Sequence, residues 1–224
     1  MRGVTTAAYD AIADWYEQFV TDTSADYQLR VRRQLADLLG NGPGRCLDVC
    51  CGTGVHAAEL RRLGWQPVGV DLSGGQLRYA RTRLPVARGD AARLPVADAS
   101  VCAVTCVLGH TDLPAYPAVV AEAARVLVPG GRFVHIGVHP CFIGPFADRS
   151  DPARIVIDGG YGERERSFRS WNSSGVRARV GAWHVPLADL LNAVTAAGLA
   201  LARVQESGAT PIPDILAFQA TKPA

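Results

Sequence analysis

A short segment near residue 50 has the residue types of a ligand-binding turn. Gly52 and Gly54 are separated by one residue, and Asp48 lies four residues before Gly52. Glycines at this spacing let the backbone turn tightly and let a ligand approach without a Cβ in the way. The helix that follows such a turn offers free backbone N–H groups to polar ligand atoms. The segment therefore predicts a binding turn between a strand and a helix.

Two further acids favour an adenine nucleoside as the ligand. Asp71 ends the next predicted strand, seventeen residues past Gly54, where a carboxylate accepts hydrogen bonds from both ribose hydroxyls. Asp90 follows the third predicted strand, where it or its neighbour Ala91 can meet an adenine amino group. Dinucleotide-dependent dehydrogenases share the glycine spacing. They have an apolar residue and a glycine in place of Asp48, however, and no need of Asp90, so the acids disfavour that alternative.

The elements that position these residues alternate between apolar runs and amphipathic stretches. Near-continuous apolar strands that alternate with helices indicate a parallel sheet covered on both faces. The expected strands are 45–50, 66–70, 86–88, 101–108 and 132–138, and the helices between them are 55–63, 74–84 and 115–127. A helix at 186–197 and two strands at 199–204 and 215–221, expected to pair antiparallel, follow.

Two regions lie outside this alternation. Residues 1–40 are expected to be helical, because Tyr9, Tyr16 and other apolar positions recur at steps of three and four. Residues 140–182 are rich in Gly, Pro, Arg and aromatic residues, and 176–180 is their only strand-like stretch. A segment of that length without periodicity is usually functional or disordered, and its aromatic content favours a function.

Composition disfavours several other classes of protein. The 224 residues fit one domain of the larger sort, and the net charge of +2 hides no block of like sign, so a nucleic-acid partner is not indicated. The six cysteines form no C-x-x-C pair and favour buried free thiols in a reducing compartment. They are Cys46, Cys50, Cys51, Cys102, Cys106 and Cys141. No apolar run has membrane-spanning length and no signal segment is visible, so we expect a cytoplasmic protein.

Four motifs in order resemble those of one enzyme family. They occupy residues 47–54, 70–73, 89–91 and 127–133. In sequence and spacing they are similar to the motifs of Rossmann-like S-adenosylmethionine-dependent methyltransferases, in particular the small-molecule branch, over roughly residues 9 to 220. One departure is Cys50, where the family often has glycine; because cysteine is still small, we expect the loop to survive.

The resemblance implies a fold, a cofactor and a set of binding residues. The fold is an α/β three-layer sandwich of the Rossmann-like type, with a mostly parallel seven-stranded sheet whose last strand is antiparallel. A single methyltransferase domain is expected over 1–224, with 1–40 as a helical lid and 140–182 as a substrate-binding insert. The cofactor is S-adenosyl-L-methionine, with its ribose at Asp71. The residues expected around it are Tyr9, Asp48, Cys50, Gly52, Gly54, Asp71, Leu72, Asp90, Ala91 and Leu108.

Three residues are candidates for the catalytic step. Methyl transfer from a sulfonium is an in-line displacement, in which alignment supplies about 7–11 kcal/mol of the barrier and a general base a further 10²–10⁴-fold, roughly. His110, at the carboxyl end of the fourth strand, is the first choice for a base or a substrate hydrogen-bond partner. His139 follows the fifth strand, and Tyr16 lies on the predicted lid. Structural alternatives are a loop hydrogen bond for His110, a turn for His139 and core packing for Tyr16.

The expected reaction is metal-independent methyl transfer to a small-molecule acceptor, by a monomer or a homodimer without a membrane or nucleic-acid partner. The acceptor is expected to be a hydrophobic or aromatic natural product, against which Trp171 could stack. Three alternatives stay open. They are a cyclase or decarboxylase that binds the same cofactor, an NAD-dependent dehydrogenase, and a non-catalytic binding module.

Overall fold

The central sheet of the protein runs β10-β11-β5-β4-β1-β2-β3 across its seven strands. The computed structural model describes residues 7–151, 153–170 and 175–224. The parallel strands are β1 (Arg45–Val49), β2 (Gln66–Asp71), β3 (Val86–Arg88), β4 (Val101–Val107) and β5 (Leu127–Val138). The sheet is completed by β10 (Ala200–Ser207) and β11 (Ile215–Thr221), and β11 is antiparallel to both of its neighbours. The expected mostly parallel sheet with an antiparallel last strand is confirmed.

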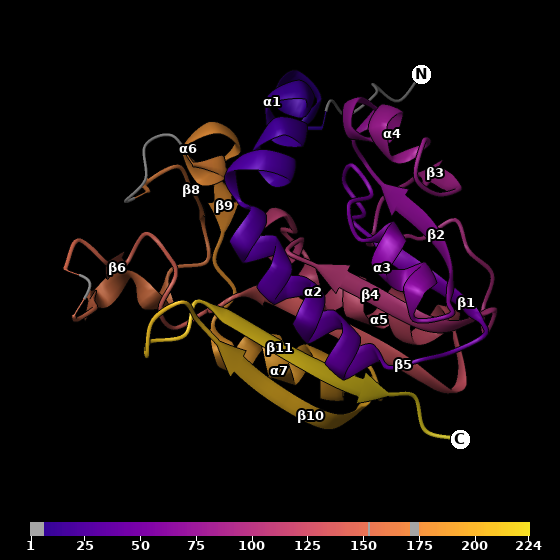
Figure 1. Ribbon diagram of the computed structural model, residues 1–224. Helices are drawn as coiled ribbons and strands as arrows, with labels where there is room; N and C mark the ends of the chain where they lie inside the picture. Colours follow the sequence, from indigo (N-terminus) through magenta and orange to yellow (C-terminus); the bar gives the residue numbers. More distant parts are fainter. Residues whose placement is uncertain (1–6, 152, 171–174) are drawn as a thin grey trace, which may run out of the picture.

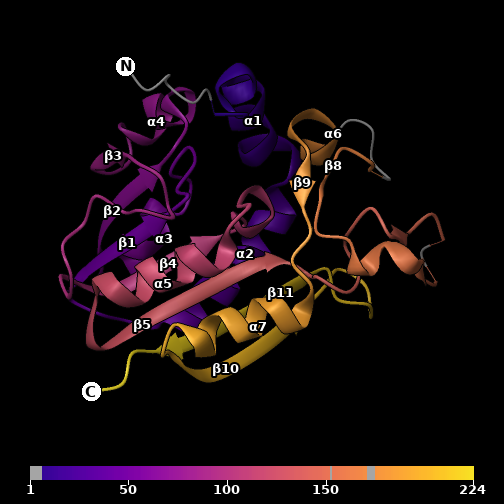
Figure 2. The ribbon, with the colours of Figure 1, turned by 180° about the vertical axis from the view of Figure 1, so that it is seen from behind.

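Helices cover both faces of this sheet. In Figure 1, α2 (Ala25–Leu39) and α3 (Ala57–Arg62) lie over one face, and in Figure 2, α5 (Tyr116–Val126) and α7 (Leu187–Ala196) lie over the other. Side chains of β4 alternate accordingly: Val104 and Cys106 pack in the core under α5 and α7, whereas Ala103 and Val107 pack in the core under α2. The three layers are those of the expected sandwich.

The other described elements surround the carboxyl ends of the parallel strands. They are η1 (Asp10–Ile12), α1 (Ala13–Gln18), the π-helical turn η2 (Phe19–Thr23), α4 (Gly74–Ala80), η3 (His110–Asp112), β6 (Ala147–Asp148), β7 (Val156–Ile157), η4 (Gly159–Gly162), β8 (Arg166–Ser167), α6 (Val176–Val180) and β9 (Ala182–Trp183). In both ribbon views α1 and α6 lie side by side at this edge of the sheet (Figures 1 and 2). The ring of Trp15 contacts the guanidinium of Arg179 at 4.1 Å. The N-terminal helices and the insert therefore meet above the sheet.

Two sequence-based predictions are wrong. The stretch 176–180, expected to be a strand, is the helix α6, which ends where the Gly181 N–H bonds to the Arg177 carbonyl oxygen with Gly181 at φ +68°. Its alternating pattern is five residues long, which is too short to separate the two periodicities. Cys102, expected to be buried, is exposed, although Cys46, Cys51 and Cys106 are buried free thiols.

The described part of the chain contains no helix with the length and hydrophobicity that crossing a membrane requires.

Candidate functional site

A cavity of about 240 Å³ lies at the carboxyl ends of β1, β2, β3 and β4. The segments that line it are the N-terminal helices, the loops after these four strands, α4, and the insert with β9. Its wall includes Tyr9, Tyr16, Cys50, Gly52, Asp71, Leu72, Gln76, Asp90, Ala91, Leu108, Thr111, Asp112, Arg166 and Trp183. Of the ten residues expected at the cofactor, the cavity thus brings together all except Asp48 and Gly54.

The loop after β1 follows a path that needs left-handed backbone. Cys50, Gly52 and Gly54 have φ values of +58°, +55° and +77°. A Cβ at Gly52 would come within 2.9 Å of the Gln76 side chain, and one at Gly54 within 2.7 Å of Leu84. Cys50 occupies a conformation that costs a non-glycine residue about 1–3 kcal/mol, which explains why glycine is frequent there in the family. Gly54 therefore shapes the turn from behind, while Gly52 leaves its Cα bare toward the cavity.

Asp71 connects the end of β2 to this loop. Its carboxylate accepts hydrogen bonds from the Gly52 N–H at 2.9 Å and from the Ser73 N–H at 2.8 Å. Burial raises the pKa of Asp71, and these backbone donors oppose that change. An ionised carboxylate offers about four acceptor positions. The N–H groups of Gly52 and Ser73 use two of them, and the remaining capacity can accept from the hydroxyls of a ribose.

Asp48 lies beneath the loop, on β1, rather than on the cavity wall. Its side chain is 1% exposed and accepts a hydrogen bond from the Thr105 hydroxyl at 2.9 Å, while its second oxygen has no partner among the described residues. Burial raises the pKa of Asp48 to about 7, against the lowering effect of the Thr105 hydrogen bond. A buried acceptor without a partner is costly unless a ligand supplies a donor or a cation.

The adenine side of the cavity is open and partly apolar. Leu72 is 41% exposed, and Ala91 and Asp90 line the cavity with it. The Asp90 carboxylate accepts a hydrogen bond from the Ala92 N–H at 2.9 Å, which fixes the turn that presents Ala91.

The N-terminal helices close the cavity from above. The Tyr9 hydroxyl donates to both carboxylate oxygens of Asp112, at 3.0 and 3.1 Å, and the Tyr9 and Tyr16 rings meet edge to face with centroids 5.2 Å apart. Asp10 accepts hydrogen bonds from the Ser73 hydroxyl at 2.7 Å and the Gly75 N–H at 3.0 Å, at the start of α4. Burial raises the pKa of both tyrosines, so they remain protonated donors.

Asp112 was missed by sequence reasoning. It ends η3, directly after β4, and faces the cavity. Enclosure by protein raises the pKa of Asp112 to about 7; the Tyr9 hydrogen bond opposes this, as do the charges of Arg166 and Arg177, while Asp71 adds to it. A carboxylate that titrates near neutral pH at a strand end suits a general base. Two more lining residues were not singled out in the sequence, Arg166 of the insert and Trp183, which follows it at the end of β9.

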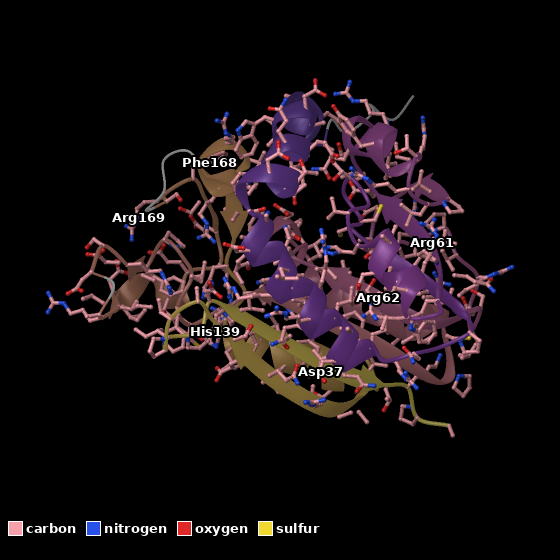
Figure 3. All side chains as sticks on the ribbon, viewed as in Figure 1. Asp37, Arg61, Arg62, His139, Phe168 and Arg169 are labelled. Atoms are coloured by element: carbon pink, nitrogen blue, oxygen red, sulfur yellow. The ribbon has the colours of Figure 1, made fainter. Side chains whose placement is uncertain are left out.

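Two of the three catalytic candidates lie away from the cavity wall. His110 is buried against His135, with ring centroids 5.0 Å apart, and burial lowers its pKa to about 3. The ring of His139 is fixed by Glu206, at 2.6 Å, and by the Cys141 N–H, at 3.1 Å, and Figure 3 places the residue beside the start of β11, near the insert. Of the three catalytic candidates, Tyr16 is the one that lines the cavity. Trp171 lies outside the described residues.

The fold is that of an α/β protein with a cavity at the carboxyl ends of its parallel strands, where open α/β sheets bind their ligands. Residues 46–131 match the methyltransferase domain family, and this segment contains the β1 loop, Asp71, Asp90 and Asp112. This segment of the chain is thus similar in sequence to methyltransferase domains.

Curated relatives and solved structures show the same similarity to methyltransferases. Demethylmenaquinone methyltransferases of Mycobacterium sp. (strain KMS) and Renibacterium salmoninarum are 41% and 37% identical over 128 and 145 residues. These matches cover 56% and 62% of this chain and 56% and 61% of the relatives, so the chain matches little more than half of their length.

The fold extends beyond the matched domain. An S-adenosylmethionine-dependent methyltransferase from Mesorhizobium loti superposes with a TM-score of 0.70 over 84% of this chain and 95% of that one, at 22% identity. The cyclase SpnF gives a TM-score of 0.63 over 87% of this chain and 80% of its own, at 18% identity. Because methyltransferases and a cyclase share the fold, the reaction has to be argued from the site.

Proposed function

We propose that the protein transfers the methyl group of S-adenosyl-L-methionine to a small-molecule acceptor. The observation that carries this proposal is the hydrogen bonding of Asp71 to the glycine loop. It connects the ends of β1 and β2, and the Asp71 carboxylate keeps acceptor capacity for a ribose. The matched methyltransferase domain supports the same conclusion.

The residues of the cavity fit this cofactor. Asp71 would hold the ribose, and Leu72, Asp90 and Ala91 would surround the adenine. The bare Cα of Gly52 admits the methionine part, and the unpartnered oxygen of Asp48 supplies negative charge beneath it. When bound, the cofactor supplies a methyl group on a cationic sulfur, which a nearby carboxylate stabilises electrostatically.

Residues 1–40 act in this proposal as a lid and 140–182 as the wall on the acceptor side, within a single domain. Tyr9 and Tyr16 exclude water from one side of the cavity, and the β8–β9 hairpin closes the other. Exclusion of water strengthens the electrostatic interactions inside. The function of this chain's residues is then mainly to align the acceptor with the methyl group.

Asp112, rather than His110 or His139, is the base that we propose. Its carboxylate borders the cavity, whereas the two histidines are engaged elsewhere. The Tyr9 hydroxyl orients it and can keep its hydrogen bond while the carboxylate takes a proton from the acceptor. Tyr16 contacts the acceptor or the methionine end of the cofactor.

The names of the relatives favour an aromatic acceptor, since these relatives are demethylmenaquinone methyltransferases. An acceptor ring would lie between Trp183 of β9 and the Asp112 carboxylate. Four properties remain predictions. They are the absence of a nucleic-acid partner, a monomeric or dimeric state, a cytoplasmic location and independence from metal ions. The last is tested by turnover in EDTA, which we expect to be unchanged.

Calorimetric titration with S-adenosylhomocysteine tests the proposed function. We expect the wild type to bind, and Asp71→Ala to bind at least about a hundredfold more weakly, because two hydrogen bonds to a charged group are lost at about 1.5–3 kcal/mol each. The exposed Asp98→Ala serves as the control. Absence of binding to the wild type, with binding of NADH instead, would replace the proposal by a dehydrogenase. If the protein binds the cofactor and converts a substrate but forms no S-adenosylhomocysteine from S-adenosylmethionine, the result would favour cyclase or decarboxylase chemistry.

A further inference from the structure

The cavity wall built by the insert carries a fixed arginine. Arg166 pairs with Trp183 in the β8–β9 hairpin, and both residues line the cavity together with Gly181. A Cβ at Gly181 would lie 3.0 Å from the Arg166 Nε, so glycine there lets the guanidinium group approach the backbone. The Arg166 Nη2 group donates to the Val180 carbonyl oxygen. This bond and the Phe168 ring, 5.4 Å from the guanidinium carbon, hold the group in place, and among the described residues Arg166 has no carboxylate partner.

Three other arginines of the insert are neutralised by neighbouring carboxylates. Arg154 pairs with Asp151, Arg164 with Asp189 and Arg169 with Asp158. Figure 3 shows Arg169 at the outer edge of the insert. Within the described ranges, Arg149, Arg166, Arg177 and Arg179 form no ion pair with a carboxylate. Arg149 donates to the Phe142 carbonyl oxygen and Arg179 lies over the Trp15 ring, whereas Arg166 lines the cavity.

Arg177 adds to this charge from α6. The helix precedes β9, and β9 packs against η3, which carries His110 and Asp112. The charge of Arg177 acts on His110, Asp112 and His184, and burial lowers the pKa of Arg177 itself. A half-buried guanidinium without a carboxylate partner is unfavourable until an anion joins it. The charge of Asp112 acts on Arg177, but among the described residues the two side chains form no direct ion pair, and the Asp112 oxygens accept from Tyr9.

We propose that Arg166 and Arg177 bind an acidic group of the acceptor, so that the substrate is an aromatic hydroxy acid whose carboxylate faces the insert. This inference rests on the proposed function, since it places the acceptor between the insert and the cofactor. Arginine binds carboxylates through paired N–H groups with defined geometry. Trp183 offers a flat apolar surface for the ring, and the hydroxyl of the acceptor then points toward the Asp112 carboxylate.

Matched pairs of acids and amides test the proposal. Hydroxybenzoates and hydroxynaphthoates, each beside its own carboxamide, are titrated calorimetrically into protein saturated with S-adenosylhomocysteine. We expect the best-bound acid to bind at least about tenfold more tightly than its amide, which is about 1.4 kcal/mol. The preference should fall to about twofold or less in Arg166→Gln and in Arg177→Gln. Arg154→Gln, on the same insert, should keep it, and Arg166→Lys should restore part of it.

The outcomes separate this inference from the proposed function. Three outcomes would overturn the assignment of the two arginines. They are equal binding of acids and amides, binding of no acid in the panel, and an acid preference that is unchanged in both glutamine variants. In those cases, binding of S-adenosylhomocysteine to the same protein samples would leave the cofactor site standing. Failure of the wild type to bind S-adenosylhomocysteine would overturn the proposed function itself.

Discussion

Replacement of Asp112 by asparagine isolates the proton transfer from the architecture of the site. The amide oxygen of Asp112→Asn can still accept the Tyr9 hydrogen bond that is seen at 3.0 Å, so the lid keeps its contact. The variant loses only the ability to take a proton. A general base contributes about 10²–10⁴-fold to turnover. We therefore expect kcat to fall by that factor, which corresponds to about 2.7–5.4 kcal/mol of activation free energy.

The pH dependence gives this prediction a second measure. Because the pKa of Asp112 is about 7, kcat/KM of the wild type should rise about tenfold per pH unit below pH 7 and level off above it. A cationic sulfonium nearby favours the carboxylate, so the kcat profile should level off at lower pH than the kcat/KM profile. In Asp112→Asn the rising limb should be lost.

The assay is release of S-adenosylhomocysteine at saturating cofactor and acceptor, with S-adenosylhomocysteine affinity measured in parallel. That affinity should stay within about threefold of the wild type, since S-adenosylhomocysteine has a neutral thioether in place of the cationic sulfonium on which the Asp112 charge would act. Asp98→Asn, at an exposed carboxylate, is the matched control. An Asp112→Asn enzyme that keeps wild-type kcat and the same rising limb would refute the assignment of the base. His110→Asn, if it removed the limb instead, would return the role to His110.

Three further predictions concern stability and the lid. Asp48 and Asp112 have pKa values near 7 when folded and about 3.9 when unfolded, so each carboxyl holds a proton in the folded state that it releases on unfolding; in thermal unfolding without cofactor, the free energy of unfolding of the wild type relative to Asp48→Asn and to Asp112→Asn should therefore fall as pH rises from about 4 to 7. Gly54→Ala should lower the free energy of unfolding by about 1–3 kcal/mol, which corresponds to about 2–4 °C of Tm per kcal/mol. Gly130→Ala should lower it by less, because Gly130 has a similar φ of +75° but no neighbour within 4 Å. Equal losses in the two variants would mean that the contact with Leu84 does not contribute. Asp10→Ala should release S-adenosylhomocysteine about tenfold faster in stopped-flow fluorescence, because the bonds from Asp10 to the start of α4 are lost; an unchanged rate would mean that the lid is held by its tyrosines alone.

The cofactor half of the site follows from local sequence. Gly52, Gly54 and Asp71 lie within twenty residues of one another, and their relation is fixed by two adjacent parallel strands. Apolar strands alternating with helices are enough to predict that arrangement. The same holds for the sheet, whose strands were placed correctly to within a few residues, apart from an earlier start of β5 and a later end of β10.

The acceptor half depends on contacts that no local pattern displays. His110 was favoured because histidine ordinarily titrates near neutral pH, yet its burial beside His135 lowers its pKa to about 3. Asp112 acquires a pKa near 7 only through enclosure by the lid and the insert. Arg166 resembled other surface arginines in the sequence, and its place on the wall follows from its pairing with Trp183, seventeen residues further along.

The hydrogen bond between Tyr9 and Asp112 joins positions that are 103 residues apart in the chain. A nascent chain presents its N-terminal helices long before β4 and η3 have been synthesised. Contacts of such separation carry a large loop-closure cost and form after the local ones. Refolding should therefore show native sheet content before the cavity is closed. An intermediate with a formed sheet and an open cavity would expose the apolar faces of Tyr9 and Tyr16 to solvent, and S-adenosylmethionine present during refolding would select the chains in which the N-terminal helices have docked.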